Sequence, residues 1–417
     1  MENGCSSVIF ATDNTRFLKV LGCHGSREAQ MGPGLNGCLA KSCKFPGPRP
    51  FGPCKPLLFV LVIFFPLCLV LPGQAETYKE QDYRDSFSTD FFFPYLDYNE
   101  KDGIIAGMDW QASSYLGDHV LSFRGGIGTK SGKEQLLAGY TYLGWYPAVG
   151  LNLFDKNTFF GDLKDTGNDK DDWRREAGGS LTFSFPLDLY NRIVPGYEIS
   201  WVDLPDDWER LNGLILSLVH DTADYYLMEI ISGSQVNLTA KYGNKAMGSE
   251  TTFQSYAGDL RFYTDLDLDE YFAAGQRLVT SLRVHGGVKK DDPRLFVLGG
   301  ENSLRGYDFN EFSGEKLWAA SLELRYPFLV IDRTTTAWDL FYFHQLLGVA
   351  FVDSGQIWRD YNDSHSISGA DVGLGGGVRL QMFVFGKIPF EVGIDLGQSV
   401  TDLNRNPKVY LVLRLGA

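Results

Sequence analysis

Apolar and polar side chains alternate with a period of two along most of the chain, and this pattern restricts the fold more than any other feature. It recurs from residue 76 onward, with clear examples at 121–127, 318–326 and 409–415. No segment in this part of the chain has a convincing helical period. Because successive side chains of a strand point to opposite faces, the pattern predicts an all-β protein.

Alternation occurs both in soluble β-sandwiches and in transmembrane barrels, so other features must separate the two. The predicted strands reach about ten residues, and they set Arg and Glu opposite bare Leu and Phe. A membrane barrel turns its apolar face to lipid and its polar face to a wet lumen. The 47 glycines and the 14% of aromatic residues also suit Gly-punctuated strands with aromatic belts. We therefore predict a transmembrane antiparallel β-barrel over residues 91–417.

About eleven candidate strands precede residue 298 and about five follow residue 307, which makes about sixteen, an even number as in bacterial barrels. The first strand is expected at 91–98. A single long strand is expected at 224–242.

The most hydrophobic run of the chain extends from Leu57 to Leu71, after Lys55. A basic flank, an apolar core and small residues before Ala75 predict a Sec signal peptide over residues 55–75, cleaved after Ala75. A transmembrane anchor is the alternative. The run is shorter than the roughly 20 residues needed to span a bilayer, however, and Pro66 interrupts it.

Residues 1–54 are rich in Gly, Pro and Cys without clear periodicity, and they remain an unassigned leader. A start codon placed upstream of the true one would account for them, with Met31 as the alternative start. Residues 76–90 are expected to form a short periplasmic segment. All six cysteines precede Ala75, so the mature chain would have no disulfide framework.

Charge and motif content exclude several classes of function. Of 38 basic residues 7 precede the cleavage site, and of 52 acidic residues 3 do, which leaves 31 against 49 in the mature chain. This acidic excess argues against nucleic-acid binding. The six histidines are scattered, and no catalytic or phosphate-binding motif is present. We expect no enzymatic activity, no cofactor and no metal site.

A glycine-framed arginine and tyrosine interrupt the strand pattern in the C-terminal third. The stretch reads Leu298-Gly299-Gly300-x-x-Ser303-Leu304-Arg305-Gly306-Tyr307. Two later stretches follow, Glu323-Leu324-Arg325-Tyr326-Pro327 and Phe351-x-Asp353-x-Gly355-x-x-Trp358. Together they resemble the (V/L)RG(F/Y) loop and the succeeding strands of the BamA/TamA-type outer-membrane assembly barrels, also called the bacterial surface antigen family.

The resemblance implies that the loop folds back into the barrel lumen and that its arginine docks on acidic groups of neighbouring strands. Carried over to this sequence, Arg305 would meet Asp353, with Glu323 as a second partner. Phe351 and Gly355 belong to the same strand motif and are expected beside the docked loop. A guanidinium pairs with a carboxylate through two parallel hydrogen bonds, which suits this role. The alternative is a solvated Arg305.

By resemblance, the protein would insert or translocate other proteins in the bacterial outer membrane. The mechanism would use a weakly paired seam between the first and last strands, where Pro94 and Pro407 each remove a ladder donor. Expected partners are outer-membrane lipid and lipopolysaccharide, client or secreted proteins, and a POTRA-bearing protein, since only residues 76–90 would precede the barrel. One alternative is a passive pore or structural surface antigen without assembly activity. Another is a soluble exported β protein.

Overall fold

The computed structural model describes residues 86–161, 173–204, 207–226, 229–266, 277–335, 340–359, 369–384 and 388–415 of the chain. The leader 1–54, the predicted signal peptide 55–75 and its cleavage site at Ala75 lie outside the described residues.

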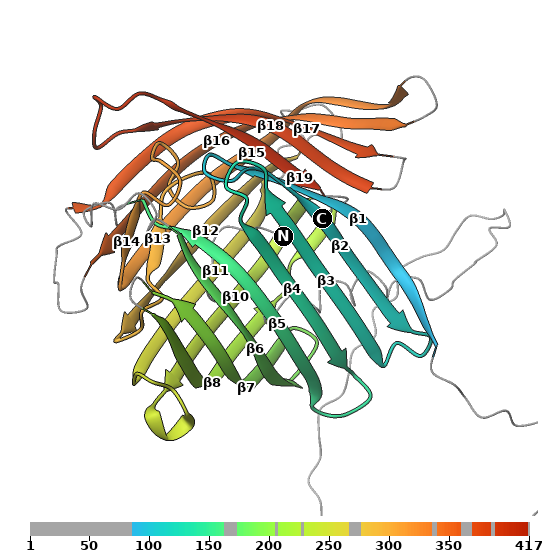
Figure 1. The fold of residues 1–417 in the computed structure, drawn as a ribbon. Helices are drawn as coiled ribbons and strands as arrows, with labels where there is room; N and C mark the ends of the chain where they lie inside the picture. The colour runs from blue at the N-terminus through green and yellow to red at the C-terminus, as the bar shows by residue number, and fades with distance from the viewer. Residues whose placement is uncertain are drawn as a thin grey trace, which may run out of the picture. The chain divides into compact units, whose positions relative to one another are not determined.

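Sixteen strands follow one another around an antiparallel, nearly closed barrel (Figure 1). They are β1 (Phe87–Asn99), β2 (Gly103–Ser114), β3 (His119–Gly128), β4 (Glu134–Tyr142), β5 (Ala148–Phe159), β6 (Trp173–Pro186), β7 (Asn191–Asp203), β8 (Trp208–Asp221), β10 (Glu229–Gly243), β11 (Phe253–Leu266), β12 (Leu278–Lys290), β15 (Lys316–Thr335), β16 (Phe341–Trp358), β17 (Asp371–Val384), β18 (Ile388–Ser399) and β19 (Lys408–Leu415). The predicted all-β barrel and its strand number are confirmed.

In their described residues, the connections between barrel strands hold three further short strands and one 3₁₀ turn. Strand β9 (Asp224–Tyr226) pairs with β10, while β13 (Phe296–Leu298) and β14 (Phe312–Gly314) pair with each other between β12 and β15. The 3₁₀ turn η2 (Lys245–Met247) follows β10. No helix in the described ranges is long and apolar enough to cross a membrane.

The strands predicted at 91–98 and 224–242 have other bounds in the structure. Strand β1 begins at Phe87 rather than at residue 91, because Phe87 and Ser88 already pair with Ser114 and Ser113 of β2. The single strand expected at 224–242 is divided into β9 and β10, and the register shifts between Ile230 and Ser232. The paired strands β13 and β14 were not predicted either.

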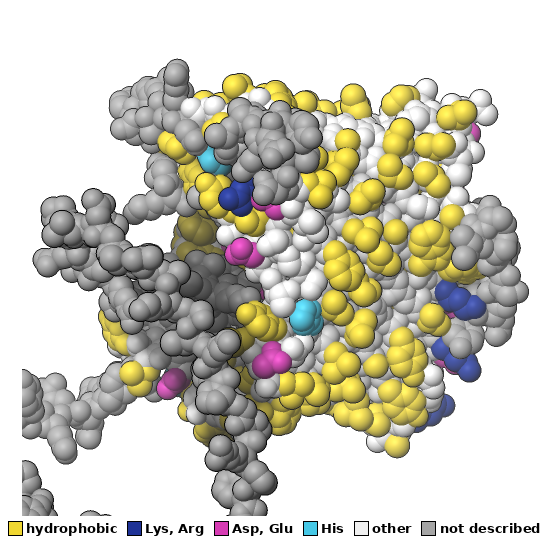
Figure 2. All heavy atoms as spheres, turned by 180° about the vertical axis from the view of Figure 1, so that it is seen from behind, with side chains coloured by type: hydrophobic (Ala, Val, Ile, Leu, Met, Phe, Trp, Pro, Cys, Tyr) yellow, Lys and Arg dark blue, Asp and Glu magenta, His cyan; other side chains and the backbone are white. Residues whose placement is uncertain are grey.

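Strand β8 shows why this sequence forms a barrel wall. Leu214, Leu216 and Leu218 are 51%, 47% and 44% exposed, whereas Ile215 and Ser217 between them are buried. Large apolar side chains therefore face outward and the other face of the strand turns inward, as in transmembrane barrels. Figure 2 shows hydrophobic side chains spread over the outer wall with few charged side chains among them.

The first and last strands, β1 and β19, lie side by side and complete the circuit (Figure 1). Each has a ladder on one edge only, β1 with β2 and β19 with β18. No register of paired residues joins β1 to β19 in the part of the chain that the structure describes. Over the described residues the barrel therefore has a seam, at which two neighbouring strands share no ladder of paired residues.

Candidate functional site: the docked loop between β12 and β15

The segment between β12 and β15, which we call the docking loop (residues 291–315), is shaped at its tip by two glycines. Gly299 and Gly300 have φ angles of 125° and 92°, which favour glycine over any other residue. The Gly299 amide donates to the Ser303 hydroxyl oxygen at 2.9 Å, and that hydroxyl donates to the Gly299 carbonyl at 3.1 Å. This local turn holds Arg305 beyond the end of β13.

Apolar residues of the docking loop pack on the inner face of the barrel wall. Leu298 and Leu304 are fully buried and Tyr307 nearly so, in one cluster with Leu317 and Ala319 of β15. Gly355 lies beneath this cluster, where an added Cβ atom would come within 3.3 Å of Leu298. Gly355, which the sequence motif placed beside the docked loop, thus lies against Leu298 rather than against Arg305.

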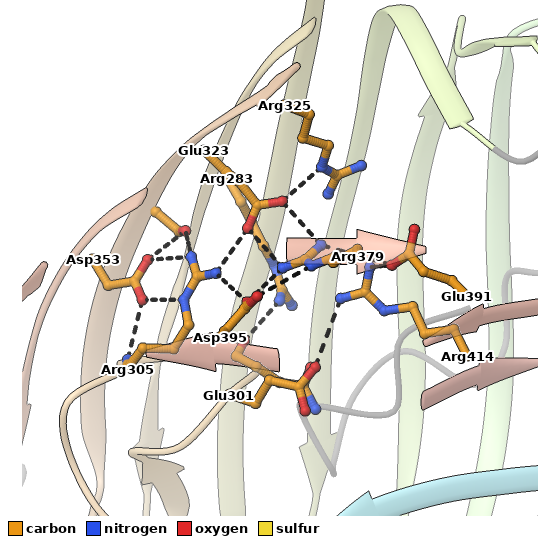
Figure 3. A network of polar contacts seen from close by, with 12 residues as sticks. Arg283, Glu301, Arg305, Glu323, Arg325, Asp353, Arg379, Glu391, Asp395 and Arg414 are labelled. Carbon is orange, nitrogen blue, oxygen red and sulfur yellow. Dashed lines mark hydrogen bonds and ion pairs between the residues drawn. The ribbon is translucent and has the colours of Figure 1, made fainter. Parts of the chain in front are cut away.

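Arg305 is 4% exposed and makes three hydrogen bonds to Asp353 on β16 (Figure 3). Its Nε and Nη2 atoms donate to the two carboxylate oxygens at 2.7 and 2.9 Å, and its backbone amide donates to Oδ2 at 3.1 Å. Nη1 donates to Glu323 on β15 at 2.8 Å. Burial by itself lowers the pKa of Arg305, but Asp353 and Glu323 together raise it above its ordinary value, so the guanidinium stays charged.

Phe351 lies on the same strand as Asp353 and completes the arginine site. The guanidinium carbon of Arg305 is 3.3 Å from the centroid of the Phe351 ring. A planar cation over a ring face in a water-poor site gains cation–π attraction in addition to its ion pairs. The structure therefore brings together Arg305, Asp353, Glu323 and Phe351, the residues to which the sequence motifs pointed.

Sequence reasoning missed a second arginine in this network, Arg379 on β17. Its Nη2 donates to Asp395 on β18 at 2.6 Å, and its Nη1 is 3.4 Å from Glu323 (Figure 3). Asp395 is also 3.4 Å from Arg305. Glu323 and Asp395 thus each face more than one guanidinium, which offsets the cost of burying these two charges. The sequence did contain a signal for this residue, because Arg379 is a charged residue that follows the alternating glycines of β17.

The backbone of the docking loop approaches β17 and β18 so closely that only glycine fits. An added Cβ atom on Gly373 would lie 1.7 Å from the Arg305 carbonyl oxygen, and one on Gly306 would lie 2.7 Å from the Ser399 amide nitrogen. Gly306 also has a φ of 101°. The glycine-rich sequence of β17 therefore makes room for the loop tip.

Tyr307 directs its hydroxyl group at polar residues of β17, β18 and the connection after β18. The oxygen lies 2.9 Å from Asp371, 2.8 Å from Ser399 and 2.5 Å from Thr401. These partners were not expected from the sequence. They extend the docked site from β15 and β16 to the last hairpin of the barrel.

Comparison with known families decides the assignment of this barrel. The Omp85 superfamily domain matches residues 81–409. The chain belongs to the Omp85 superfamily. The resemblance inferred from the motifs is confirmed, and an Omp85 barrel indicates an outer-membrane location.

Solved structures agree with the Omp85 fold at low sequence identity. BamA from Haemophilus ducreyi lacking POTRA domains 1-3 is similar with a TM-score of 0.56 and 16% identity, over 80% of this chain and 70% of that one. CdiB from Acinetobacter baumannii gives 0.51 and 14%, over 78% of this chain and 59% of that one. CdiB from Escherichia coli gives 0.52 and 14%, over 81% and 63%. This Omp85 chain thus spans less than two thirds of either CdiB chain. No curated protein matches it in sequence.

A second ion network holds the base of the docking loop on the opposite side of this Omp85 barrel. Arg294 donates to Asp292 at 2.8 and 2.9 Å, and its Nη1 donates to Glu198 of β7 at 2.9 Å. Glu198 also accepts from Lys241 of β10 at 2.8 Å. The loop is therefore anchored to the β6 to β10 part of the wall at its base and to the β15 to β19 part at its tip.

Other contacts strengthen this second anchor. Asn310 donates to the Phe159 carbonyl at 3.1 Å, and Arg174 donates to the Pro293 carbonyl at 3.0 Å. Sequence analysis did not single out Arg294, because Glu198, the acid that it meets on the barrel wall, lies on β7 and far from it in the chain. Among the described residues of the Omp85 barrel, no cluster of His, Cys, Asp and Glu side chains is arranged to hold a metal ion.

Proposed function

We propose that this Omp85 barrel inserts or translocates other proteins across or into the outer membrane, and that the seam between β1 and β19 is where a client strand engages. One observation carries the proposal. Strands β1 and β19 are neighbours, yet each is laddered on one edge only within the described residues. An unpaired edge exposes backbone donors and acceptors that an incoming strand can satisfy.

The lengths of the seam strands support the same proposal. β19 pairs with β18 only between Lys408 and Leu415, whereas β1 extends over Phe87–Asn99. Pro94 lies within β1 and Pro407 directly precedes β19, and neither has an amide hydrogen to donate. Over the described residues, β1 is therefore longer than the strand beside it.

The partners follow from this mechanism. The clients would be β-rich chains that add a strand to the seam, and outer-membrane lipid with lipopolysaccharide would surround the apolar wall. A POTRA-bearing protein would deliver the clients. Export would use the predicted signal peptide at 55–75.

A seam lock tests the mechanism directly. All six cysteines precede Ala75, so paired cysteines introduced into β1 and β19 would be the only thiols of the mature chain. Pairs scanned along the two strands and crosslinked by oxidation are expected to stop the assembly of other outer-membrane proteins while the barrel stays folded. Reduction should restore assembly.

The matched control is a crosslink across an existing ladder. Ala112 and Leu121 are directly opposite on β2 and β3, so A112C/L121C adds a disulfide without touching the seam. This variant should assemble clients normally. If seam-locked barrels assemble clients as well as the control, or if depletion of the protein leaves other outer-membrane proteins unaffected, the assembly role fails and a passive pore or surface antigen replaces it.

A further inference from the structure

The last strand of the barrel is attached to the docking loop by side chains on its inner face. Lys408 pairs with Asp308, and Arg414 lies 3.8 Å from Glu301. Val412 between them is fully buried, whereas Val409 on the opposite face is 59% exposed. Alternate residues of β19 thus face the loop, while the others face outward.

The side-chain contacts with the docking loop hold β19 in addition to its ladder with β18. An interior strand of a barrel is hydrogen-bonded along both edges, but among the described residues β19 has a ladder only with β18. The docking loop contacts the inner face of β19 rather than its edge. It therefore holds the strand while its outer edge stays unpaired.

Tyr410 makes the most direct of these attachments. Its hydroxyl oxygen accepts a hydrogen bond from the Gly306 amide at 2.8 Å, and the hydroxyl donates to the Tyr307 carbonyl oxygen at 2.8 Å. The side chain is 5% exposed. Both backbone groups lie within two residues of Arg305, so the ion pairs of Arg305 also determine where the partners of Tyr410 lie.

We propose that Tyr410 is a positioning residue that couples the docked Arg305 loop to β19 and so sets the position of the seam edge. When the loop tip is docked, the hydroxyl of Tyr410 bridges the Gly306 amide and the Tyr307 carbonyl and holds the strand at the wall. When the tip moves, the strand loses this bridge and its edge gains freedom. The consequence for clients rests on the proposed function, but the coupling itself does not.

Hydrogen–deuterium exchange of the purified full barrel, without any client, tests the coupling. Tyr410→Phe keeps the ring and removes the hydroxyl that makes both hydrogen bonds. Exchange in peptides covering β19 is expected to rise roughly threefold to tenfold, the effect of losing a net hydrogen bond or two. Peptides covering β2 to β6 should exchange as in the unchanged protein.

Tyr197→Phe is the matched control. The hydroxyl of Tyr197 on β7 donates to the Met247 carbonyl at 2.6 Å, so the same chemical change is made at a loop contact away from the seam. In the Tyr197→Phe protein, the β19 peptides should exchange as in the unchanged protein. Heat-modifiable gel migration of both variants reports whether the barrel is folded.

Two results would overturn the proposal. One is β19 exchange in the Tyr410→Phe protein that equals that of the Tyr197→Phe control. The other is an equal rise in all strands, which would mean that Tyr410 contributes only to global stability. Client assembly is measured separately, so a failed assembly role and a failed coupling give different outcomes.

Discussion

Arg305 and Asp353 are joined by three hydrogen bonds, two from the guanidinium and one from the backbone amide of the arginine. Asp353 therefore fixes both the side chain and the main chain of the loop tip. A lysine at position 305 could form neither the fork of bonds nor the stacked contact on Phe351.

Because this pair is buried, we expect Arg305→Ala and Asp353→Ala each to destabilise the barrel by about 3–5 kcal/mol, the usual effect of leaving a buried charge unpaired. The double variant should lose much less than the sum of the two, since neither charge is then left alone. Urea titration of the heat-modifiable form measures the loss. Additive losses would contradict the direct pairing.

The close approach at Gly373 predicts a steric effect. Gly373→Ala places a methyl group against the Arg305 carbonyl oxygen and should shift the docked loop, at a cost of about 1–3 kcal/mol. Gly348→Ala on β16 is the control, because its nearest neighbour, Phe328, would lie at an ordinary 3.5 Å. Equal stability of the two variants in the same urea titration would argue against the tight contact.

The ion network around Arg294 predicts that the base of the docking loop also contributes to the stability of the barrel. Arg294→Ala leaves Asp292 and Glu198 without their shared cation and should destabilise the barrel by several kcal/mol. Arg175→Ala removes an arginine that is paired with Asp155 but 48% exposed, so its effect should stay below about 1 kcal/mol. A proteolysis assay of the loop in both variants would reveal whether Arg294 holds it.

Because of Glu301, we expect the stability of the barrel to depend on pH. Burial raises the pKa of this loop carboxyl from 4.5 to about 7, against the lowering effect of Arg414. Because the folded pKa exceeds the unfolded one, the folded state binds more protons between these values, and stability falls as the pH rises from 4.5 to 7. The slope is at most about 1.4 kcal/mol per pH unit.

Glu301→Gln should remove this contribution and stabilise the barrel above pH 7, as measured by thermal melting across the pH range. Asp97 and Asp395 also lie near Glu301 and are kept in both proteins. An unchanged pH profile in the glutamine variant would show that Glu301 is not the group responsible.

The strands of the barrel and the contacts of its loop could be predicted from the sequence on different grounds. The alternation of β8, with Leu214, Leu216 and Leu218 on one face, is a local property of the chain and predicts a strand with one apolar face without knowledge of its neighbours. The pairing of Arg305 with Asp353 was expected only through the family motif. The first residue of β1 was not predictable, because Phe87 joins the barrel through its pairing with β2.

The sequence alone thus determined an all-β membrane barrel of this family and the arginine at the centre of its loop, since side-chain alternation and the motif residues are written in short stretches. Only the tertiary structure decided that Arg379 and Asp395 share the network of Arg305, that Arg294 anchors the base of the loop, and that Tyr410 joins the loop to the last strand. The physical reason is that these contacts depend on strand register and on the path of the loop through the lumen. Both emerge only when sixteen strands close around a common interior.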